Sequence, residues 1–184
     1  MMIEELNTKK LFVSLDNTSS RLLAMISSLS ETTLNIIPFK HSWTAAQLAA
    51  HVTKSNTSIA QALKMEAKPS ERDPGERIHE LKEMFLDFTI KFQTPDFILP
   101  TQDTYEKETL IAKLKRSNEL LKEAADKVNL SGILSLPAFG EITKLELLHF
   151  VLYHTQRHLH QLKNIFAALK DNKNHTNGKP SKNC

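Results

Sequence analysis

The chain has 184 residues, of which 40% are hydrophobic and 24% charged, and only 4 are glycine. This length favours a single domain, and the composition is typical of a globular, helix-rich protein. The net charge is +3, and basic residues alternate with acidic ones, as in residues 105–127, a pattern of solvated helix faces that argues against a nucleic-acid-binding surface.

The sequence gives no sign of export or of membrane insertion. The only cysteine is Cys184, so no internal disulfide can form. The first ten residues carry two acids and no apolar run, unlike a signal peptide. The apolar stretches are too short to span a bilayer. We therefore expect a cytoplasmic protein with no membrane partner.

Apolar residues at helical spacing predict four long helices, over residues 8–30, 45–66, 105–128 and 141–170. The second helix has a clear start, because Thr44 and Gln47 have the spacing of a capping box, with Trp43 just before it as a core anchor. In the third helix Ser117 interrupts the apolar stripe, and its hydroxyl is expected to bond to a backbone carbonyl one turn back. The loop before the fourth helix ends at Gly140.

Nearly forty residues separate the second and third helices, and residues 77–88 within them have the spacing of a shorter fifth helix. Residues 93–100, with two prolines, are expected to be extended. These elements predict an all-α fold, a four-helix bundle with one long crossover that carries the short extra helix. The bundle is expected to occupy residues 1–170, and the polar residues 171–184 are expected to form a disordered tail.

The fourth helix contains histidines that differ in where they point. On a helical wheel its apolar face is centred about 70° from His154, which places His158 inside that face and His154 at its edge. His149 and His160 fall on the opposite, polar side, and we expect them to lie at the surface. An inward imidazole is costly to bury unless its nitrogens find partners.

A third inward histidine lies on the second helix. His51 occupies the same edge of the apolar face there that His154 occupies on the fourth helix. If the two helices are neighbours, His51, His154 and His158 can meet around one ion. Three neutral nitrogens suit Zn²⁺, and Ni²⁺ or Fe²⁺ are possible, with one position left for water or substrate. His41, His79 and His175 are not expected to be ligands.

The segments HSWTAAQLAAHV and GEITKLELLHFVLYHTQRHLHQLKNI resemble the DinB/YfiT-like superfamily of metalloenzymes. The matching features are a tryptophan before a capped helix, then a histidine, then H-x3-H with a glutamine three residues later. The resemblance covers most of residues 8–168. It implies an up-down-down-up bundle, often dimeric, with a divalent metal, usually zinc or nickel, on His51, His154 and His158. Relatives include thiol transferases, a thiol-dependent isomerase and metal-dependent hydrolases.

Several functions stay open at this point. The sequence H-T-Q-R-H lacks the glutamate base of a zincin peptidase. A hydrolase would then rely on water activated by the metal. A transferase would use the metal to activate a low-molecular-weight thiol for attack on a small electrophile, and the resemblance favours this. The alternatives are a bundle that binds a small molecule or metal without turnover, and a structural bundle without metal.

Three residues near the histidines are weaker candidates. Gln161 borders the pair on the fourth helix and could orient His158 or a bound water. Ser55 faces inward one turn after His51 and could touch a substrate. Arg157 could bind an anionic group of a substrate.

Overall fold

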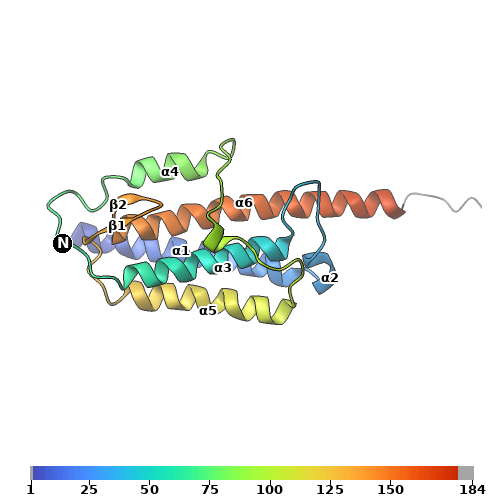
Figure 1. The fold of residues 1–184 in the computed structure, drawn as a ribbon, viewed down its shortest axis with the longest axis horizontal. Coiled ribbons are helices and arrows are strands. Elements are labelled where there is room, and N and C mark those ends of the chain that lie inside the picture. The colour runs from blue at the N-terminus through green and yellow to red at the C-terminus, as the bar shows by residue number, and fades with distance from the viewer. Residues whose placement is uncertain (1, 178–184) are drawn as a thin grey trace, which may run out of the picture.

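The computed structural model describes the backbone of residues 2–177 and the side chains of residues 8–171. The elements in chain order are α1 (Met2–Ser28), α2 (Glu31–Leu34), α3 (Ala45–Leu63), α4 (Ile78–Leu86), the 3-10 helix η1 (Asp96–Ile98), α5 (Lys107–Ala125), β1 (Ile133–Leu136), β2 (Gly140–Thr143) and α6 (Lys144–Asn177). Helices α1 and α6 run in one direction, and α3 and α5 run in the other (Figure 1). The predicted up-down-down-up four-helix bundle is confirmed.

Helix α3 begins where the capping box predicts. The Thr44 hydroxyl accepts from the Gln47 amide at 3.0 Å, and the Gln47 side-chain oxygen accepts from the Thr44 amide at 3.0 Å. These two bonds satisfy donors that a helix start otherwise leaves unpaired. On α5 the Ser117 hydroxyl donates to the Leu114 carbonyl at 2.8 Å, so the polar residue in that stripe is satisfied locally.

The crossover between α3 and α5 carries α4, as predicted, and also the short helix η1 within the segment expected to be extended. Helix α4 packs against α6, and η1 packs against α3. The prediction that His149 and His160 lie at the surface is wrong, because both are half-buried. His160 stacks on Phe88 with ring centroids 4.0 Å apart.

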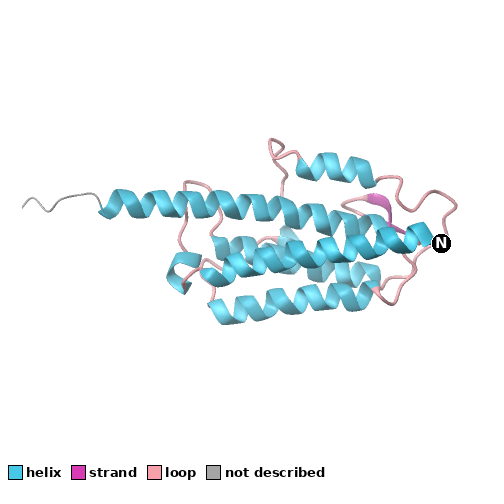
Figure 2. Ribbon diagram, turned by 180° about the vertical axis from the view of Figure 1, so that it is seen from behind, coloured by secondary structure: helices cyan, strands magenta, loops and turns pink. Residues whose placement is uncertain are grey.

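A two-stranded hairpin precedes α6 and was not predicted. Strands β1 and β2 pair antiparallel, with Ile133 opposite Thr143, and lie at the end of the bundle where α1 begins (Figures 1 and 2). Gly140 closes the hairpin loop at a φ of 66°, a left-handed conformation that glycine adopts without strain. Because residues 140–143 are extended, α6 begins at Lys144 and not at residue 141.

Helix α6 continues to Asn177, beyond the predicted end of the bundle at residue 170. Residues 178–184 of the predicted disordered tail lie outside the described residues, as does the side chain of His175. None of the described helices is long and apolar enough to cross a membrane.

The core has two apolar regions, one at the hairpin end of the bundle and one at the α2 end. Helix α6 contributes residues 147, 148 and 150–153 to the first region and Leu159, Leu162, Ile165 and Leu169 to the second. His154 and His158 fall between the two, and on α3 the buried polar residue Ser55 falls between Val52 and Ile59 in the same way. The bundle therefore places polar side chains in the middle of an otherwise apolar core.

Candidate metal centre

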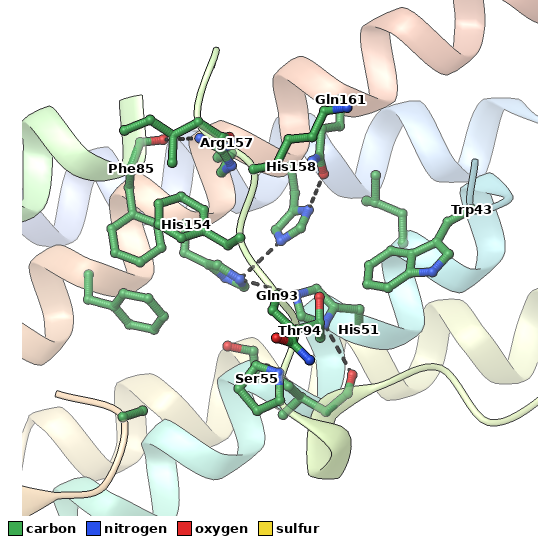
Figure 3. A pocket seen from close by; sticks show the side chains of 18 of the residues that line it. Trp43, His51, Ser55, Phe85, Gln93, Thr94, His154, Arg157, His158 and Gln161 are labelled. Carbon is green, nitrogen blue, oxygen red and sulfur yellow. Dashed lines mark hydrogen bonds between the residues drawn. The ribbon is translucent and has the colours of Figure 1, made fainter. Parts of the chain in front are cut away.

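Three histidines from two neighbouring helices meet in the middle of the bundle. His51 lies on α3, and His154 and His158 lie one turn apart on α6 (Figure 3). Their exposed fractions are 3%, 7% and 6%, so water can reach very little of each ring. The Nε2 atom of His154 lies 3.1 Å from Nε2 of His51 and 3.0 Å from Nε2 of His158.

In His51 and His158, a hydrogen bond at Nδ1 fixes the tautomer of the neutral imidazole. His51 Nδ1 donates to the Ile98 carbonyl at 3.1 Å, and His158 Nδ1 donates to Oε1 of Gln161 at 2.7 Å. Both acceptors are oxygens, so the proton of each neutral imidazole lies on Nδ1. Nε2 of His51 and Nε2 of His158 therefore both present a lone pair to His154.

The cluster cannot satisfy itself by hydrogen bonding. A neutral His154 has one N–H, so Nε2 can donate to one of its two neighbours at most, and a second contact of about 3 Å brings two lone pairs together. If the proton lies on Nε2, Nδ1 becomes a buried acceptor, and Nδ1 of His154 has no hydrogen-bond partner among the described residues. A buried polar group that lacks a hydrogen-bond partner is costly, and its presence needs an explanation.

Burial keeps the three imidazoles neutral. It lowers the pKa of His51 and lowers that of His154 well below the usual value, where the neighbouring His158 and His51 add to the effect. For His158, burial and the charge of His51 lower the pKa to about 3. At neutral pH all three Nε2 atoms are therefore available as donors to a cation, which protonated imidazoles would not be.

The geometry fits a divalent metal ion. Ligand atoms of His51, His154 and His158 all lie within 4.8 Å of one another, and this group could hold an ion. Zn–N bonds of 2.0–2.1 Å in a tetrahedron place ligand nitrogens about 3.3 Å apart, close to the separations seen between the Nε2 atoms. Three imidazole ligands are typical of catalytic sites, in which a fourth position stays open.

The histidines lie on the wall of a cavity of about 940 Å³. All three line it, together with Ser55, Gln161 and Arg157. Aromatic rings form much of the remaining wall: Phe39, Trp43, Phe85, Phe88, Phe92, Phe97, Phe139 and Phe150. No aspartate or glutamate of the described chain lines this cavity. The volume suits a small organic molecule, and the wall is that of a ligand site with few polar groups.

The weaker candidates from the sequence have different surroundings. Gln161 accepts from His158 and so holds the ring, as expected. Ser55 is buried and lines the cavity. Arg157 lines the cavity too, but its guanidinium donates to the carbonyls of Phe85 and Asp87 at 3.2 and 2.8 Å, and also to that of Ile90. Arg157 is therefore a much weaker candidate for binding an anionic substrate group than the sequence indicated.

Other parts of the site could not be assigned from the sequence. Trp43 is half-buried and lines the cavity, with its ring 5.1 Å from that of His51, where a core anchor was expected. Phe150 stacks on His154 at 5.1 Å and an angle of 28°. The sequence did hold one indication of an aromatic cavity wall: four of the nine phenylalanines lie within residues 85–97 of the crossover.

The remaining histidines of the described chain do not join the cluster. His79 is exposed on α4 and lies 3.4 Å from Glu83. His41 is exposed in the loop before α3 and lines the rim of the cavity. His149 approaches the Tyr153 hydroxyl at 3.3 Å.

Comparisons with known proteins agree with this picture. Solved structures with the same fold include TT2238, a four-helix bundle protein, at a TM-score of 0.57 and 21% identity, covering 85% of this chain and 98% of that one. A conserved protein from Enterococcus faecalis matches at a TM-score of 0.62 and 18% identity, covering 89% of this chain and 97% of that one. At these identities the likeness establishes the fold alone. No curated protein matches the sequence.

The family model of the DinB superfamily matches residues 14–162, which include the three histidines and the helices that carry them. The match spans most of the bundle and leaves out only the start of α1 and the end of α6. The chain therefore belongs to the DinB superfamily.

Proposed function

We propose that this protein is a divalent-metal-dependent enzyme that transfers a low-molecular-weight thiol to a small electrophile, with the ion held by His51, His154 and His158. Zinc or nickel is the expected ion, and iron is a further candidate. The observation that carries the proposal is the convergence of three Nε2 atoms, 3.0 and 3.1 Å apart, on the wall of a large cavity.

The residues around the histidines have defined tasks in this proposal. The Ile98 carbonyl and the Gln161 side chain accept from Nδ1 of His51 and of His158, and thereby aim both Nε2 atoms at the same point. Phe150 packs against His154 and limits the rotation of that ring. A divalent ion held there would lower the pKa of a thiol that binds it, and so supply a thiolate at neutral pH.

The composition of the cavity wall favours a thiol over water as the nucleophile. A hydrolase of the zincin type needs a carboxylate base near the ion, and no carboxylate of the described chain lines the cavity. A thiolate, once formed, attacks without a base. A hydrolase that relies on metal-activated water is the second candidate. A binding protein without turnover would be favoured by a closed, packed core, whereas here a cavity adjoins the histidines.

The test is an assay of thiol conjugation with purified, metal-loaded protein. We expect conjugation of a small electrophile with at least one common thiol, a rate that falls on metal removal, and loss of that rate in His154→Ala. No rate above that of the metal-free protein with any thiol would contradict the transferase, and ester hydrolysis that depends on the metal would favour the second candidate. The homodimer implied by the family resemblance stays a prediction, and light scattering of the purified protein would test it.

A further inference from the structure

One segment of the crossover forms a wall of the cavity on its own. Residues 87–97, between α4 and the middle of η1, are named the aromatic strap below. Its cavity-lining members are Phe88, Ile90, Lys91, Phe92, Gln93, Thr94, Pro95 and Phe97. In Figure 3, Gln93 and Thr94 lie in the same part of the cavity as Ser55 and His51. The strap therefore borders the cavity beside the metal centre.

Arg157 holds the first end of the aromatic strap. Its guanidinium donates to the carbonyls of Phe85, Asp87 and Ile90 and lies 4.7 Å from the centre of the Phe92 ring. The side chain starts from α6, between His154 and His158 in the sequence. The five N–H donors of arginine are spread over a rigid planar fork and so reach carbonyls in different directions, whereas the three donors of lysine all leave from one nitrogen.

The second end of the strap is held by the other helix of the metal centre. The Ile98 carbonyl accepts from His51, and the Leu99 carbonyl accepts from Lys54 at 2.6 Å. Both ends are thus tied to residues on or beside the metal-binding turns of α3 and α6. The position of the strap is fixed relative to the three Nε2 atoms and not only to the surface of the bundle.

The strap exposes large apolar side chains to solvent. The exposed fractions of Phe88, Phe92 and Phe97 are 46%, 41% and 66%. Phe92 stacks on Phe85 at 5.0 Å, and Phe85 meets Phe150 edge-to-face at 5.0 Å, so a row of rings leads toward His154. A contiguous exposed apolar wall beside polar groups marks a ligand site.

We propose that Arg157 is a positioning residue that holds the aromatic strap as the specificity wall of the site, which selects substrates with an aromatic or extended apolar body. This inference rests on the proposed function, because the metal centre would bind the sulfur while the strap binds the body. Arg157 acts through the strap and not by contact with an anionic group, since three of its five N–H donors already go to carbonyls of the crossover.

The experiment compares two thiols that share a donor but differ in body, ethanethiol and 2-phenylethanethiol. Their dissociation constants are measured from the thiolate-to-cobalt charge-transfer band of the cobalt-loaded protein. We expect 2-phenylethanethiol to bind about 10-fold more tightly, because its ring is buried against the strap. Arg157→Ala should remove most of this preference, leaving about 2-fold, when both dissociation constants are measured on protein of known cobalt content.

Arg157→Lys separates positioning from charge. A lysine keeps the positive charge, but its donors leave from a single nitrogen and cannot reproduce the planar fork that reaches these carbonyls, so it should behave like Arg157→Ala. Arg116→Ala is the matched control, since Arg116 pairs with Glu119 and Glu123 on α5 and does not line the cavity. Retention of the full preference in Arg157→Lys would assign Arg157 a charge role and overturn the proposal.

A second readout needs no metal. Lys91 lies exposed in the strap, so trypsin cleavage after Lys91 reports how well the strap is held. Both Arg157 variants should be cleaved there several-fold faster than the wild-type chain and Arg116→Ala. Unchanged cleavage would overturn the anchoring role. Metal-loaded wild-type protein without any preference between the two thiols would overturn the specificity wall alone, whereas failure to take up metal would contradict the proposed function as well.

Discussion

Helix α6 carries two buried polar centres, and they differ in whether they are complete. Glu146, at its start, is fully buried and accepts two hydrogen bonds from Arg72 at 2.7 Å, one from the Arg77 amide at 2.9 Å and one from the Thr143 amide at 2.9 Å. Thr143 accepts in turn from the Glu146 amide at 3.1 Å, the reciprocal pair of a capping box. The Glu146 carboxylate therefore has hydrogen-bond donors for both of its oxygens, and the Arg72 guanidinium balances its charge.

The histidine centre lies two to three turns further along α6. It is also buried, but its polar atoms lack a full set of hydrogen-bond partners. Its three Nε2 atoms face one another with too few protons to share. Buried polar groups that satisfy one another stabilise the fold, whereas groups that converge without satisfaction need a further partner. The first centre ties the crossover to α6, and the second is a group that could hold an ion.

The largest effect is expected from Glu146→Ala. It leaves the Arg72 guanidinium and two backbone amides without their acceptor, and should lower the free energy of unfolding by about 3 kcal/mol. Urea unfolding of the metal-free protein measures this change. The surface variant Arg116→Ala should stay within about 0.5 kcal/mol of the wild type. Metal bound per folded chain should not change in Glu146→Ala, and a loss of metal there would merge the two centres into one.

A divalent ion should stabilise the folded protein only when the three histidines are intact. With free ion at 100 times its dissociation constant, linkage predicts about 2.7 kcal/mol of added stability. Thermal unfolding with the ion and with a chelator measures it. His154→Ala should show no such difference, while His79→Ala, which changes an exposed histidine of α4, should respond as the wild type does. Equal stabilisation of His154→Ala would place the ion elsewhere.

The two centres should lose stability in different pH windows. The histidine pKa values are lowered by burial from an unfolded value of 6.5, so their contribution is complete above pH 6.5 and is lost as the pH falls below it. The Glu146 pKa is held below 4.5 by Arg72 and the backbone amides despite burial, so its contribution is lost only below that value. Each histidine can contribute up to about 1.4 kcal/mol per pH unit.

This difference can be measured in the metal-free protein between pH 6.5 and 5. His158→Gln should reduce the fall in stability over that range by about 1 kcal/mol relative to the wild type. Glu146→Gln should leave the fall unchanged, because Glu146 stays ionised in both states there. Parallel pH profiles of the wild type and His158→Gln would show that His158 is not buried in its neutral form.

The last effect is on metal affinity and is expected from Gln161→Ala. Loss of the acceptor for His158 Nδ1 should weaken metal binding about 10-fold through poorer orientation of the ring. Competition titration with a chromophoric chelator measures the affinity. The control is Gln156→Ala, because Gln156 is half-buried on the same helix and does not line the cavity. Unchanged affinity in Gln161→Ala would mean that the ring is oriented by packing alone.

The sequence predicts most of this architecture because local chemistry encodes it. The four-helix pattern follows from apolar periodicity, and the Thr44–Gln47 capping box fixes the start of α3 and thereby the direction of His51. The spacing of His154 and His158 places both on one face of a helix. The convergence of His51 with this pair needed only that α3 and α6 be neighbours, and they are.

The parts that were missed depend on long-range contacts. A wheel for an isolated α6 shows one apolar face, but the crossover returns to pack against this helix, where Phe88 stacks on His160. Both His149 and His160 are half-buried as a result of the tertiary fold. The hairpin at residues 133–143 is too short to show a clear alternation, and its place is fixed by pairing with Lys68 of the crossover. The role of Arg157 depends on three backbone carbonyls 67 to 72 residues away, which no local pattern reveals.

Anomalous X-ray diffraction from crystals of the metal-loaded protein, recorded on both sides of the absorption edge of the ion, would locate the metal in the fold. We expect one strong peak per chain, within bonding distance of Nε2 of His51, His154 and His158 and bordering the cavity. A protein saturated with metal whose anomalous peak lies away from these three atoms would contradict this expectation.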